Sequence, residues 1–369
     1  MERALARSRD RFSAPRHTHR RIRLMIVDDS TVARAVLSRM VESDPAFEIT
    51  AVAGTAEDAI EALGECRVDV VVLDLEMPGA GGLKSIPRII AAAAGAKVMI
   101  VSSLAEDGAE QTVAALALGA ADTMPKPGIG RFNGKFSEIL LGKLKALGHA
   151  SDQPPLPVTR KGDAQELLRA MPADPIDVLA IGASTGGIHA LGVLFQALPK
   201  RIGVPILVTQ HLPMPFMSVF ARQLGAVARR EAVVAADGME LLPDRILVAP
   251  GDAHLTLDAA PSGAVVRLTH GRSSSGCMPS VDPMFASVGA VFRGGALGVV
   301  LTGMGRDGVD GASRLVSCGG SILAQDEATC AVWGMPRAVL EAGLACAVLP
   351  PDKIARRIAA RTQEAAPCK

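Results

Sequence analysis

The chain has 369 residues, of which 49% are hydrophobic, 21% are charged and only 3% are aromatic, and its formal net charge is +1. This length suits about two to three domains, and the near-zero net charge argues against a protein that binds nucleic acid. No apolar run approaches a membrane span, the N-terminus lacks the apolar core of a signal peptide, and the six cysteines show no CxxC or metal-type spacing, so we expect a protein of the reducing cytoplasm without direct membrane insertion.

Residues 1–22 carry seven arginines and two acidic residues without a hydrophobic period. This pattern predicts a disordered basic tail, with a docking arm as the alternative. From Arg23 onward, short apolar runs alternate with amphipathic helical stretches. The alternation predicts βαβ units around a parallel sheet, in a doubly wound, flavodoxin-like α/β domain. The apolar runs lie at residues 24–27, 49–53, 70–73, 98–101 and 120–124.

Polar side chains follow the predicted strands of this first domain. Asp28 and Asp29 come after the first run, and Asp74 after the third. In a doubly wound sheet these strands are neighbours, so the three carboxylates converge where ligands bind. Oxygen ligands of this kind suit Mg²⁺, and one carboxylate could then accept a phosphoryl group. Ser102 and Lys126 follow the fourth and fifth runs, where a hydroxyl and an ammonium could contact phosphate oxygens.

These residues, with LDLEMP at 73–78, VSS at 101–103 and Lys126-Pro127, resemble a response-regulator receiver domain over residues 23–147. The resemblance implies that Asp74 is phosphorylated and that Asp28, Asp29 and Asp74 bind Mg²⁺. It also implies that Ser102 and Lys126 sense the phosphoryl group.

Two positions depart from the receiver pattern. Gly81 stands where the family usually has an acidic residue, and Thr123 stands where it usually has an aromatic switch residue. Beyond this domain, residues 148–175 are rich in proline and polar residues, with one short helical patch at 164–171. This composition predicts a partly stiff linker.

A second α/β series begins with an apolar run at residues 176–181. The run breaks at Gly182, presents Ser184 and continues through Gly186 into a helical pattern. This order predicts a buried strand, a tight turn and a helix, and Gly-x-Ser-x-Gly fits the nucleophile-elbow pattern. The alternative is that Ser184 caps the helix in a phosphate- or dinucleotide-binding turn.

Two further chemical groups follow later apolar runs. His211 follows one run, after Thr209-Gln210, and Asp307 follows another in a glycine-rich loop, so both lie at the sheet edge predicted for Ser184. One edge could therefore hold a nucleophile, a base and a group that orients the base. The later apolar runs lie at residues 204–208, 246–249, 297–301 and 321–323.

Other pairings compete with this one. The chain order of α/β-hydrolases would favour His254 or His270 with an acid such as Asp237 or Asp252. The segment between the two histidines has the alternation and the Pro-Ser-Gly turn of a hairpin, which favours strand positions for both. The pattern alone therefore favours Ser184, His211 and Asp307.

The second series resembles the chemotaxis protein-glutamate methylesterase (CheB) family over residues 175–350. This resemblance implies a Rossmann-like parallel α/β catalytic domain with an antiparallel hairpin at residues 176–350, followed by a C-terminal helix or tail at 351–369. Trp333 stands where the family often has tyrosine. The resemblance rests on GASTGG at 182–187, QHLP at 210–213, APGDAHL at 249–255, PSVDPMF at 279–285, LTGMGRDG at 301–308 and AQDEAT…WGMP at 324–336.

The family resemblance implies a role for each matching residue. Ser184 would be the nucleophile, His211 the general base and then acid, and Asp307 its orienter. Met304 would contribute to the oxyanion site, with Thr185 nearby. The ester chemistry itself would need no cofactor.

It also implies a phosphorylation-activated methylesterase that releases methanol from glutamate γ-methyl esters on the cytoplasmic helices of chemoreceptors and deamidates receptor glutamines. A CheA-type histidine kinase would donate the phosphoryl group, and a receptor methyltransferase would oppose the reaction. Two alternatives remain open at this point. The second domain could be a non-enzymatic module that binds a nucleotide or a protein helix, or an esterase for a receptor of a paralogous, non-chemotaxis pathway.

Overall fold

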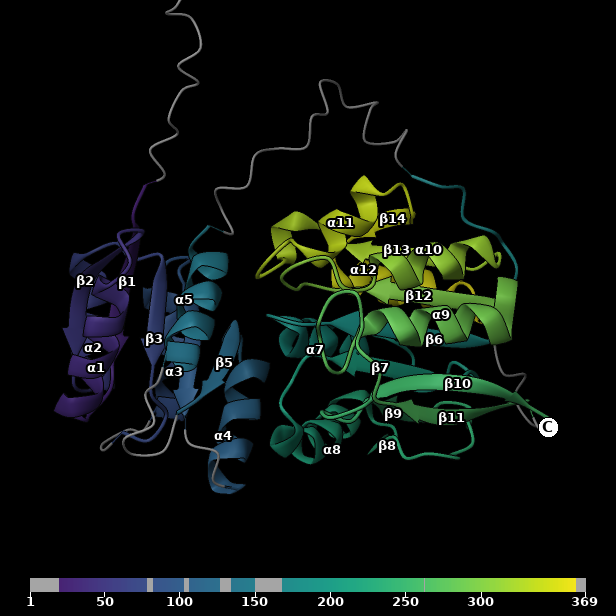
Figure 1. The fold of residues 1–369 in the computed structure, drawn as a ribbon, viewed down its shortest axis with the longest axis horizontal. Coiled ribbons are helices and arrows are strands. Elements are labelled where there is room, and N and C mark those ends of the chain that lie inside the picture. The colour runs from purple at the N-terminus through teal and green to yellow at the C-terminus, as the bar shows by residue number, and fades with distance from the viewer. Residues whose placement is uncertain are drawn as a thin grey trace, which may run out of the picture.

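The computed structural model describes residues 20–77, 82–102, 106–126, 134–149, 168–261 and 263–362. They form two α/β domains that lie side by side (Figure 1). The tail was predicted at residues 1–22; its residues 1–19 lie outside the described residues, as do most of the linker and Gly81. Ile22 begins a strand and is buried, so the predicted tail extends too far. Among the residues described, no helix combines the length and the apolarity that crossing a membrane requires.

The N-terminal domain has a five-stranded parallel sheet in the order β2-β1-β3-β4-β5, which confirms the flavodoxin-like prediction. Since β1 lies between β2 and β3, the chain reverses its winding direction at the β1/β3 boundary, where such sheets bind ligands. The elements are β1 (Ile22–Val27), α1 (Thr31–Glu42), β2 (Phe47–Ala53), α2 (Ala56–Glu65), β3 (Val70–Leu73), α3 (Gly82–Ala92), β4 (Lys97–Ser102), α4 (Glu106–Ala117), β5 (Asp122–Pro125) and α5 (Gly134–Gly148).

The strands of this sheet are apolar along their whole length because helices cover both faces. In β1, Leu24 and Ile26 pack into one core cluster, while Met25 and Val27 pack into the other. The strand ends before Asp28, and Ser30 then caps α1 by accepting a hydrogen bond from a backbone N–H at 3.3 Å. The cap begins the helix directly after the acidic pair and so leaves that pair at the sheet edge.

The C-terminal domain has a seven-stranded parallel sheet in the order β14-β13-β12-β6-β7-β9-β8. Its first strand, β6, lies between β7 and β12, so this sheet also has a switch point, at the β6/β12 boundary. The sequence patterns did not identify β8 or β14. The strands are β6 (Val178–Ala183), β7 (Ile206–Gln210), β8 (Ala232–Val234), β9 (Ile246–Val248), β12 (Ala296–Val300), β13 (Ser321–Gln325) and β14 (Ala345–Leu349), and the predicted hairpin is formed by β10 (His254–Ala260) and β11 (Gly263–Thr269).

Helices cover both faces of this sheet as well. Leu179 and Ile181 of β6 pack toward α7, α8 and α12, whereas Val178 and Ala180 pack toward α9, α10 and α11. This alternation is the two-residue period of a strand. The helices are α7 (Gly187–Ala197), α8 (Met217–Ala228), α9 (Val281–Phe292), α10 (Val309–Ser317), α11 (Met335–Glu341) and α12 (Pro351–Ala359), with short 3₁₀ turns η1 (Met214–Phe216), η2 (Arg293–Gly295) and η3 (Glu327–Thr329).

Two predicted domain boundaries need correction. Helix α12 buries Ile354 and Ile358 in the core beside α7, so residue 350 is too early an end for the catalytic domain. Residues 168–175 lie against the same domain: the backbone N–H of Arg169 donates to the carbonyl of Ala345 at 2.9 Å. Residues 168–170 are not helical, and the rest of the predicted helical patch before them lies outside the described residues.

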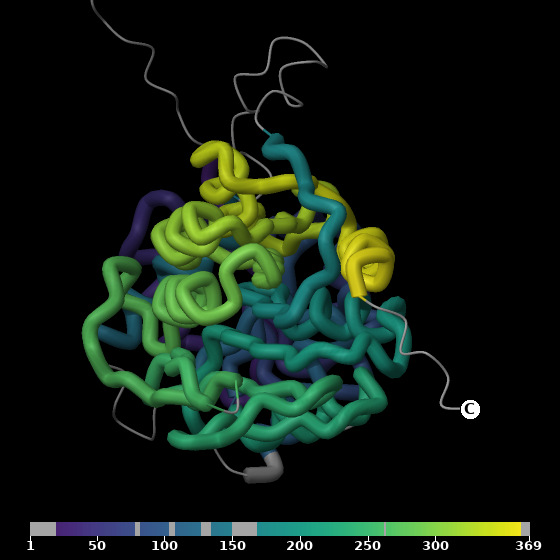
Figure 2. The backbone as a smooth tube through the Cα atoms, turned by 90° about the vertical axis from the view of Figure 1, so that its right-hand side faces the viewer, coloured from purple at the N-terminus to yellow at the C-terminus, as the bar shows by residue number. Residues whose placement is uncertain are grey.

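The two domains contact each other directly, with the C-terminal domain in front of the N-terminal one in Figure 2. Helix α4 packs against α7, α8 and η1, and buried side chains from both domains share one continuous core cluster. Arg222 of α8 pairs with Glu110 of α4. The carboxyl edge of the seven-stranded sheet therefore faces the α4–β5 region of the neighbouring domain.

Candidate functional site

Ser184 lies in a turn that only particular glycines allow. Gly186 has φ of +77°, a left-handed conformation that glycine adopts without strain. A Cβ on Gly187, the first residue of α7, would lie 2.2 Å from Oε1 of Gln210. The backbone N–H of Ser184 donates to the carbonyl of Thr302 at 3.0 Å, across the switch point. The turn thus fixes the serine between the ends of β6 and β12.

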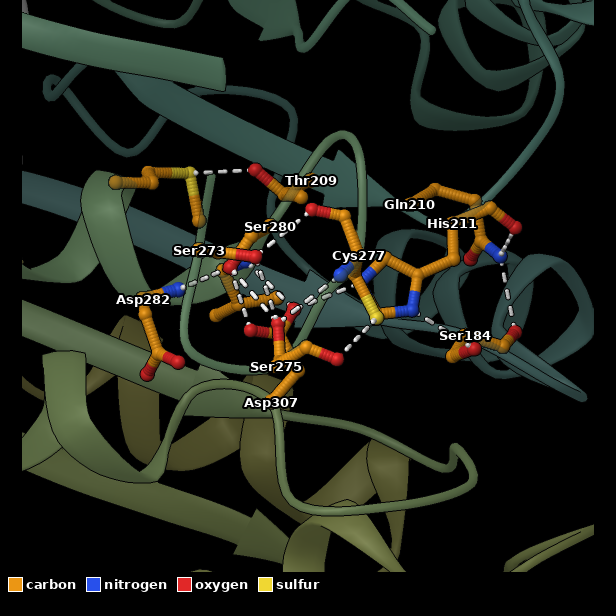
Figure 3. A network of polar contacts seen from close by, with 12 residues as sticks. Ser184, Thr209, Gln210, His211, Ser273, Ser275, Cys277, Ser280, Asp282 and Asp307 are labelled. Atoms are coloured by element: carbon orange, nitrogen blue, oxygen red, sulfur yellow. Dashed lines mark hydrogen bonds and ion pairs between the residues drawn. The ribbon is translucent and has the colours of Figure 1, made fainter. Parts of the chain in front are cut away.

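The structure brings Ser184, His211 and Asp307 into one chain of hydrogen bonds (Figure 3). Nδ1 of His211 lies 3.1 Å from Oγ of Ser184, and Nε2 lies 2.7 Å from Oδ2 of Asp307. The ring is turned relative to the serine-protease arrangement, in which Nε2 faces the serine. Because either ring nitrogen can accept a proton, this orientation preserves the capacity of the imidazole to act as a base.

Asp307 is buried, with 2% of its surface exposed, and takes two further hydrogen bonds. Oγ of Ser280 donates to Oδ1 at 2.6 Å, and the backbone N–H of Val281, the first residue of α9, donates to Oδ2 at 2.8 Å. Burial raises the pKa of Asp307, but the hydrogen bonds from His211, Ser280 and Val281 outweigh it and lower the pKa below the usual value. Asp307 is therefore an ionised acceptor that holds the imidazole.

The charge of Asp307 also acts on His211. Burial lowers the pKa of His211, but the hydrogen bond with Asp307 and the nearby Cys277 side chain have the larger combined effect and raise that pKa to about 9. The imidazolium form is thus well stabilised, which is the form produced when the ring takes the serine proton.

Two backbone N–H groups next to Ser184 have no acceptor among the described residues: those of Thr185 and Met304. The chain before Met304 passes so close that a Cβ on Gly303 would lie 2.7 Å from Cβ of Ser184. The Met304 side chain is exposed. An oxyanion site requires unpaired donors beside the nucleophile. The geometry therefore favours the predicted oxyanion role of Met304, performed by its backbone N–H.

The competing histidines have other partners. His254 is buried: its Nε2 lies 2.7 Å from the carbonyl of Gly271, and its Nδ1 accepts the backbone N–H of Ser280 at 2.9 Å. His270 lies 3.1 Å from the backbone carbonyl of Asp252. Asp237 pairs with Arg267 on the hairpin. The contacts of His254, His270 and Asp237 stabilise loops and the hairpin. His254 also supports the site indirectly because it positions Ser280.

Sequence reasoning missed Ser280, Gln210 and Cys277. Ser280 caps α9, and the serine before Val-Asp in PSVDPMF is a signal for such a cap. Gln210 donates from Nε2 to the carbonyl of Ser184 at 2.9 Å, and no spacing rule points to it. Cys277 lies in the loop after the hairpin, where periodic patterns end.

The neighbouring domain covers the triad. The backbone N–H of Gly186 donates to the carbonyl of Ala121 at 2.6 Å, and Oγ1 of Thr185 donates to Oδ2 of Asp122 at 2.7 Å. The crevice left between the domains at Ser184 has a volume of about 10 Å³, which suits about one water molecule. Ser184 keeps only partial exposure, so this arrangement restricts the approach of a protein substrate to the serine.

The predicted acidic cluster is also formed, at the switch point of the first sheet. Carboxylate oxygens of Asp28, Asp29 and Asp74 lie within 4.8 Å of one another. Nζ of Lys126 lies 2.8 Å from Asp28 and 2.7 Å from Asp74. Burial raises the pKa of Asp74, and Lys126 only partly opposes the effect. Three crowded carboxylates with oxygen-only ligands fit a hard cation such as Mg²⁺.

Two hydroxyls near this edge are buried without a hydrogen-bond partner among the described residues, those of Ser102 and Thr123. Ser102 also accepts the backbone N–H of Lys126 on its carbonyl at 2.8 Å, so both predicted sensing residues lie at one edge. An unpartnered hydroxyl there fits contact with an added phosphoryl oxygen. Thr123 has 5% of its surface exposed, so the position usually taken by an aromatic switch residue is buried here.

The fold and the two sites define a class of protein: a response regulator whose output domain carries a serine-hydrolase triad. Residues 24–131 match the response regulator receiver domain, and residues 179–358 match the CheB methylesterase domain. A protein-glutamate methylesterase/protein-glutamine glutaminase of Caulobacter vibrioides is 42% identical over 94% of this chain and 100% of its own length. One of Paramagnetospirillum magneticum is 36% identical over 90% of this chain and 94% of its own. The chain belongs to the CheB family of chemotaxis response regulators.

Among solved structures, the CheB methylesterase catalytic domain of Thermotoga maritima is 35% identical, with a TM-score of 0.49, and the match covers 50% of this chain and 97% of that one.

Proposed function

We propose that this protein hydrolyses glutamate γ-methyl esters on chemoreceptors and that phosphorylation of Asp74 activates it. The observation that carries the proposal is the hydrogen-bonded chain from Ser184 through His211 to the buried carboxylate of Asp307. A serine hydroxyl attacks an ester only when a base takes its proton, and this chain supplies both the base and its orienter.

The proposed reaction has two halves. Oγ of Ser184 attacks the ester carbonyl and passes its proton to Nδ1 of His211, while the N–H groups of Thr185 and Met304 hold the oxyanion. The C–O bond to methanol breaks, and the imidazolium returns the proton to the leaving methoxide. Water then attacks the glutamyl-enzyme with the same base, which frees Ser184 and a glutamate carboxylate. The ester chemistry uses no cofactor in this scheme.

The same site would deamidate receptor glutamine. Amide and ester hydrolysis pass through similar tetrahedral intermediates, and ammonia then replaces methanol as the leaving group. The names of the relatives include both activities. The substrate segments would be cytoplasmic helices of methyl-accepting chemotaxis proteins, where a receptor methyltransferase adds the groups that this enzyme removes.

The control we propose begins at the acidic cluster. Asp28, Asp29 and Asp74 would hold Mg²⁺, which neutralises charge during transfer of a phosphoryl group from a CheA-type histidine kinase. Ser102 and Lys126 would bind the new phosphoryl oxygens. Phosphorylation would favour arrangements in which the receiver domain leaves the triad, a shift between two populations. The crevice of about 10 Å³ at Ser184 supports this view of the closed state.

The test is methanol release from a methyl-esterified chemoreceptor cytoplasmic fragment, with and without acetyl phosphate and Mg²⁺. We expect slow release that rises with the phosphodonor, no rise in Asp74→Asn, and a loss of at least about a thousandfold in Ser184→Ala. Methanol release that does not respond to the phosphodonor would contradict the proposed control by phosphorylation. No release from folded, phosphorylated protein would contradict the substrate and favour a receptor of a paralogous pathway or a binding module.

A further inference from the structure

The thiol of Cys277 lies beside the triad and has no part in the reaction described above. Its Sγ, a ring nitrogen of His211 and a carboxylate oxygen of Asp307 all lie within 4.8 Å of one another. Figure 3 shows the sulfur next to the imidazole ring. Cys277 is only partly buried, and His211 keeps a small exposed fraction. The three side chains come from separate loops, so the spacing of the cysteines along the chain gave no sign of the cluster.

The loop that carries Cys277 is held in place by its own hydrogen bonds. Oγ of Ser273 donates to the carbonyl of Cys277 at 2.9 Å, and the backbone N–H of Cys277 donates to Oγ of Ser275 at 3.3 Å. Gly276 adopts φ of +72°, which turns the chain just before the cysteine. Oγ of Ser274 donates to Asp310 at 2.8 Å and ties the loop to α10. These hydrogen bonds hold the backbone that carries the thiol.

A thiolate, an imidazole nitrogen and a carboxylate oxygen are the three ligand types that Zn²⁺ takes from proteins. This donor set differs from the oxygen-only acidic cluster of the receiver domain, which suits Mg²⁺. We propose that Cys277, His211 and Asp307 form a site for Zn²⁺, with a solvent molecule as fourth ligand, and that the bound metal reversibly inhibits the esterase.

The present geometry requires little movement to admit the metal. Nitrogen and oxygen ligands of a tetrahedral Zn²⁺ are about 3.3 Å apart, and Nε2 of His211 now lies 2.7 Å from Oδ2 of Asp307. Separation of these two atoms by about half an ångström makes room for the ion. Oδ1 of Asp307 keeps its hydrogen bond from Ser280, the kind of outer contact that orients a metal-binding carboxylate.

The expected inhibition follows from where the proton of the His211 ring lies when the metal is bound. This part of the inference rests on the proposed esterase function. On binding, the thiol gives its proton to solvent, and Zn²⁺ takes the place of the proton between His211 and Asp307. The single proton of the neutral ring must then lie on Nδ1, which donates to Ser184 and no longer accepts its proton. If the metal binds Nδ1 instead, it blocks that nitrogen directly. In either case the general base is lost.

The direct test uses Co²⁺ as a spectroscopic substitute for Zn²⁺, added to the full chain in excess Mg²⁺ so that the acidic cluster is occupied. A Co²⁺–thiolate bond gives a charge-transfer absorption in the near ultraviolet. We expect this band to saturate at about one equivalent, to disappear on addition of Zn²⁺, to be absent in Cys277→Ser and to persist in Cys318→Ser, a variant of an exposed cysteine. Absence of the band, or its persistence in Cys277→Ser, overturns the site.

The second test measures methanol release against Zn²⁺ concentration, with each variant compared with its own metal-free rate. We expect inhibition of the unaltered chain that a chelator reverses, and a concentration for half-inhibition at least about tenfold higher in Cys277→Ser. Equal inhibition of both proteins overturns the inhibitory role. If neither protein releases methanol, the proposed function fails, and the Co²⁺ band still decides whether the metal site exists.

Discussion

At the scale of single residues, Asp307 is the group on which the site depends. Its two oxygens accept from His211, Ser280 and the N-terminus of α9, and His254 in turn positions Ser280. A buried carboxylate with these donors stays ionised and fixes the tautomer of the ring. Residues from three separate parts of the chain thus orient the imidazole that activates the nucleophile.

The pH dependence of the esterase tests this coupling. Burial lowers the pKa of His211, but Asp307 and Cys277 together raise it to about 9. Because only the neutral ring can take the serine proton, kcat/KM should rise about tenfold per pH unit below this pKa and level off above it. The measurement is initial rates between about pH 6.5 and 10 in metal-free buffer, with the Ser184→Ala rate subtracted as the hydroxide background.

The matched variants for this profile are Cys277→Ser and Cys318→Ser. Cys277 is one of the groups that raise the pKa of His211, so its removal should move the rising limb toward lower pH. Cys318 is exposed and has no such contact among the described residues, so its profile should not move. A plateau already reached near pH 6.5 in the unaltered chain would contradict the coupling.

At the scale of secondary-structure elements, both sites follow from the order of the strands. The acidic cluster lies between β1 and β3, and the triad lies around β6, at its boundaries with β12 and β7. Apolar runs located these strands, and the residue just after each run was therefore predictable. Loop-borne residues such as Ser280 and Cys277 were not, because loop conformation depends on contacts that no sequence period encodes.

One hydrogen bond between the domains should govern the basal rate. Asp122, at the start of β5, accepts the Thr185 hydroxyl at 2.7 Å, next to the nucleophile. A hydrogen bond to a charged group contributes about 1.5–3 kcal/mol, so Asp122→Ala should raise methanol release without phosphodonor by about tenfold or more. The assay compares basal and acetyl phosphate-stimulated rates, and thermal melting checks that the variant is folded.

Glu110→Ala is the matched control within the same interface. Glu110 pairs with Arg222, and both side chains are largely exposed, so this ion pair should contribute only about 0.2–1 kcal/mol. We therefore expect a basal rate within about fivefold of the unaltered chain. If both substitutions change the basal rate equally, the Asp122–Thr185 hydrogen bond contributes no more than the Glu110–Arg222 pair to holding the receiver domain over the triad.

At the scale of the whole molecule, the two domains were predictable but their arrangement was not. Two runs of alternating strands and helices, separated by a proline-rich segment, identify two α/β domains. The way α4 packs on α7 and α8 depends on the fit of side chains from distant parts of the sequence. The same limit explains the early boundary at residue 350, since the packing of α12 on α7 is also a tertiary contact.

The last prediction concerns removal of the receiver domain. Deletion of residues 1–150 removes α4 and β5 and opens the carboxyl edge of the catalytic sheet, while the seven strands and the helices α7 to α12 remain. If the receiver domain acts mainly as a cover, methanol release without phosphodonor should rise by about tenfold or more and should no longer respond to acetyl phosphate.

The deletion also exposes apolar side chains of the shared core cluster. A fall in rate could therefore come from unfolding of the shortened chain or from loss of a receiver domain that assists catalysis. A second variant and a melting curve serve as controls. Ser184→Ala in the shortened chain must abolish release, and the melting curve of the shortened chain must remain cooperative. A folded fragment that works more slowly than the full chain would mean that the receiver domain assists catalysis. The contacts of Ala121 and Asp122 with the turn at Ser184 would then position the nucleophile, and inhibition by coverage would be excluded.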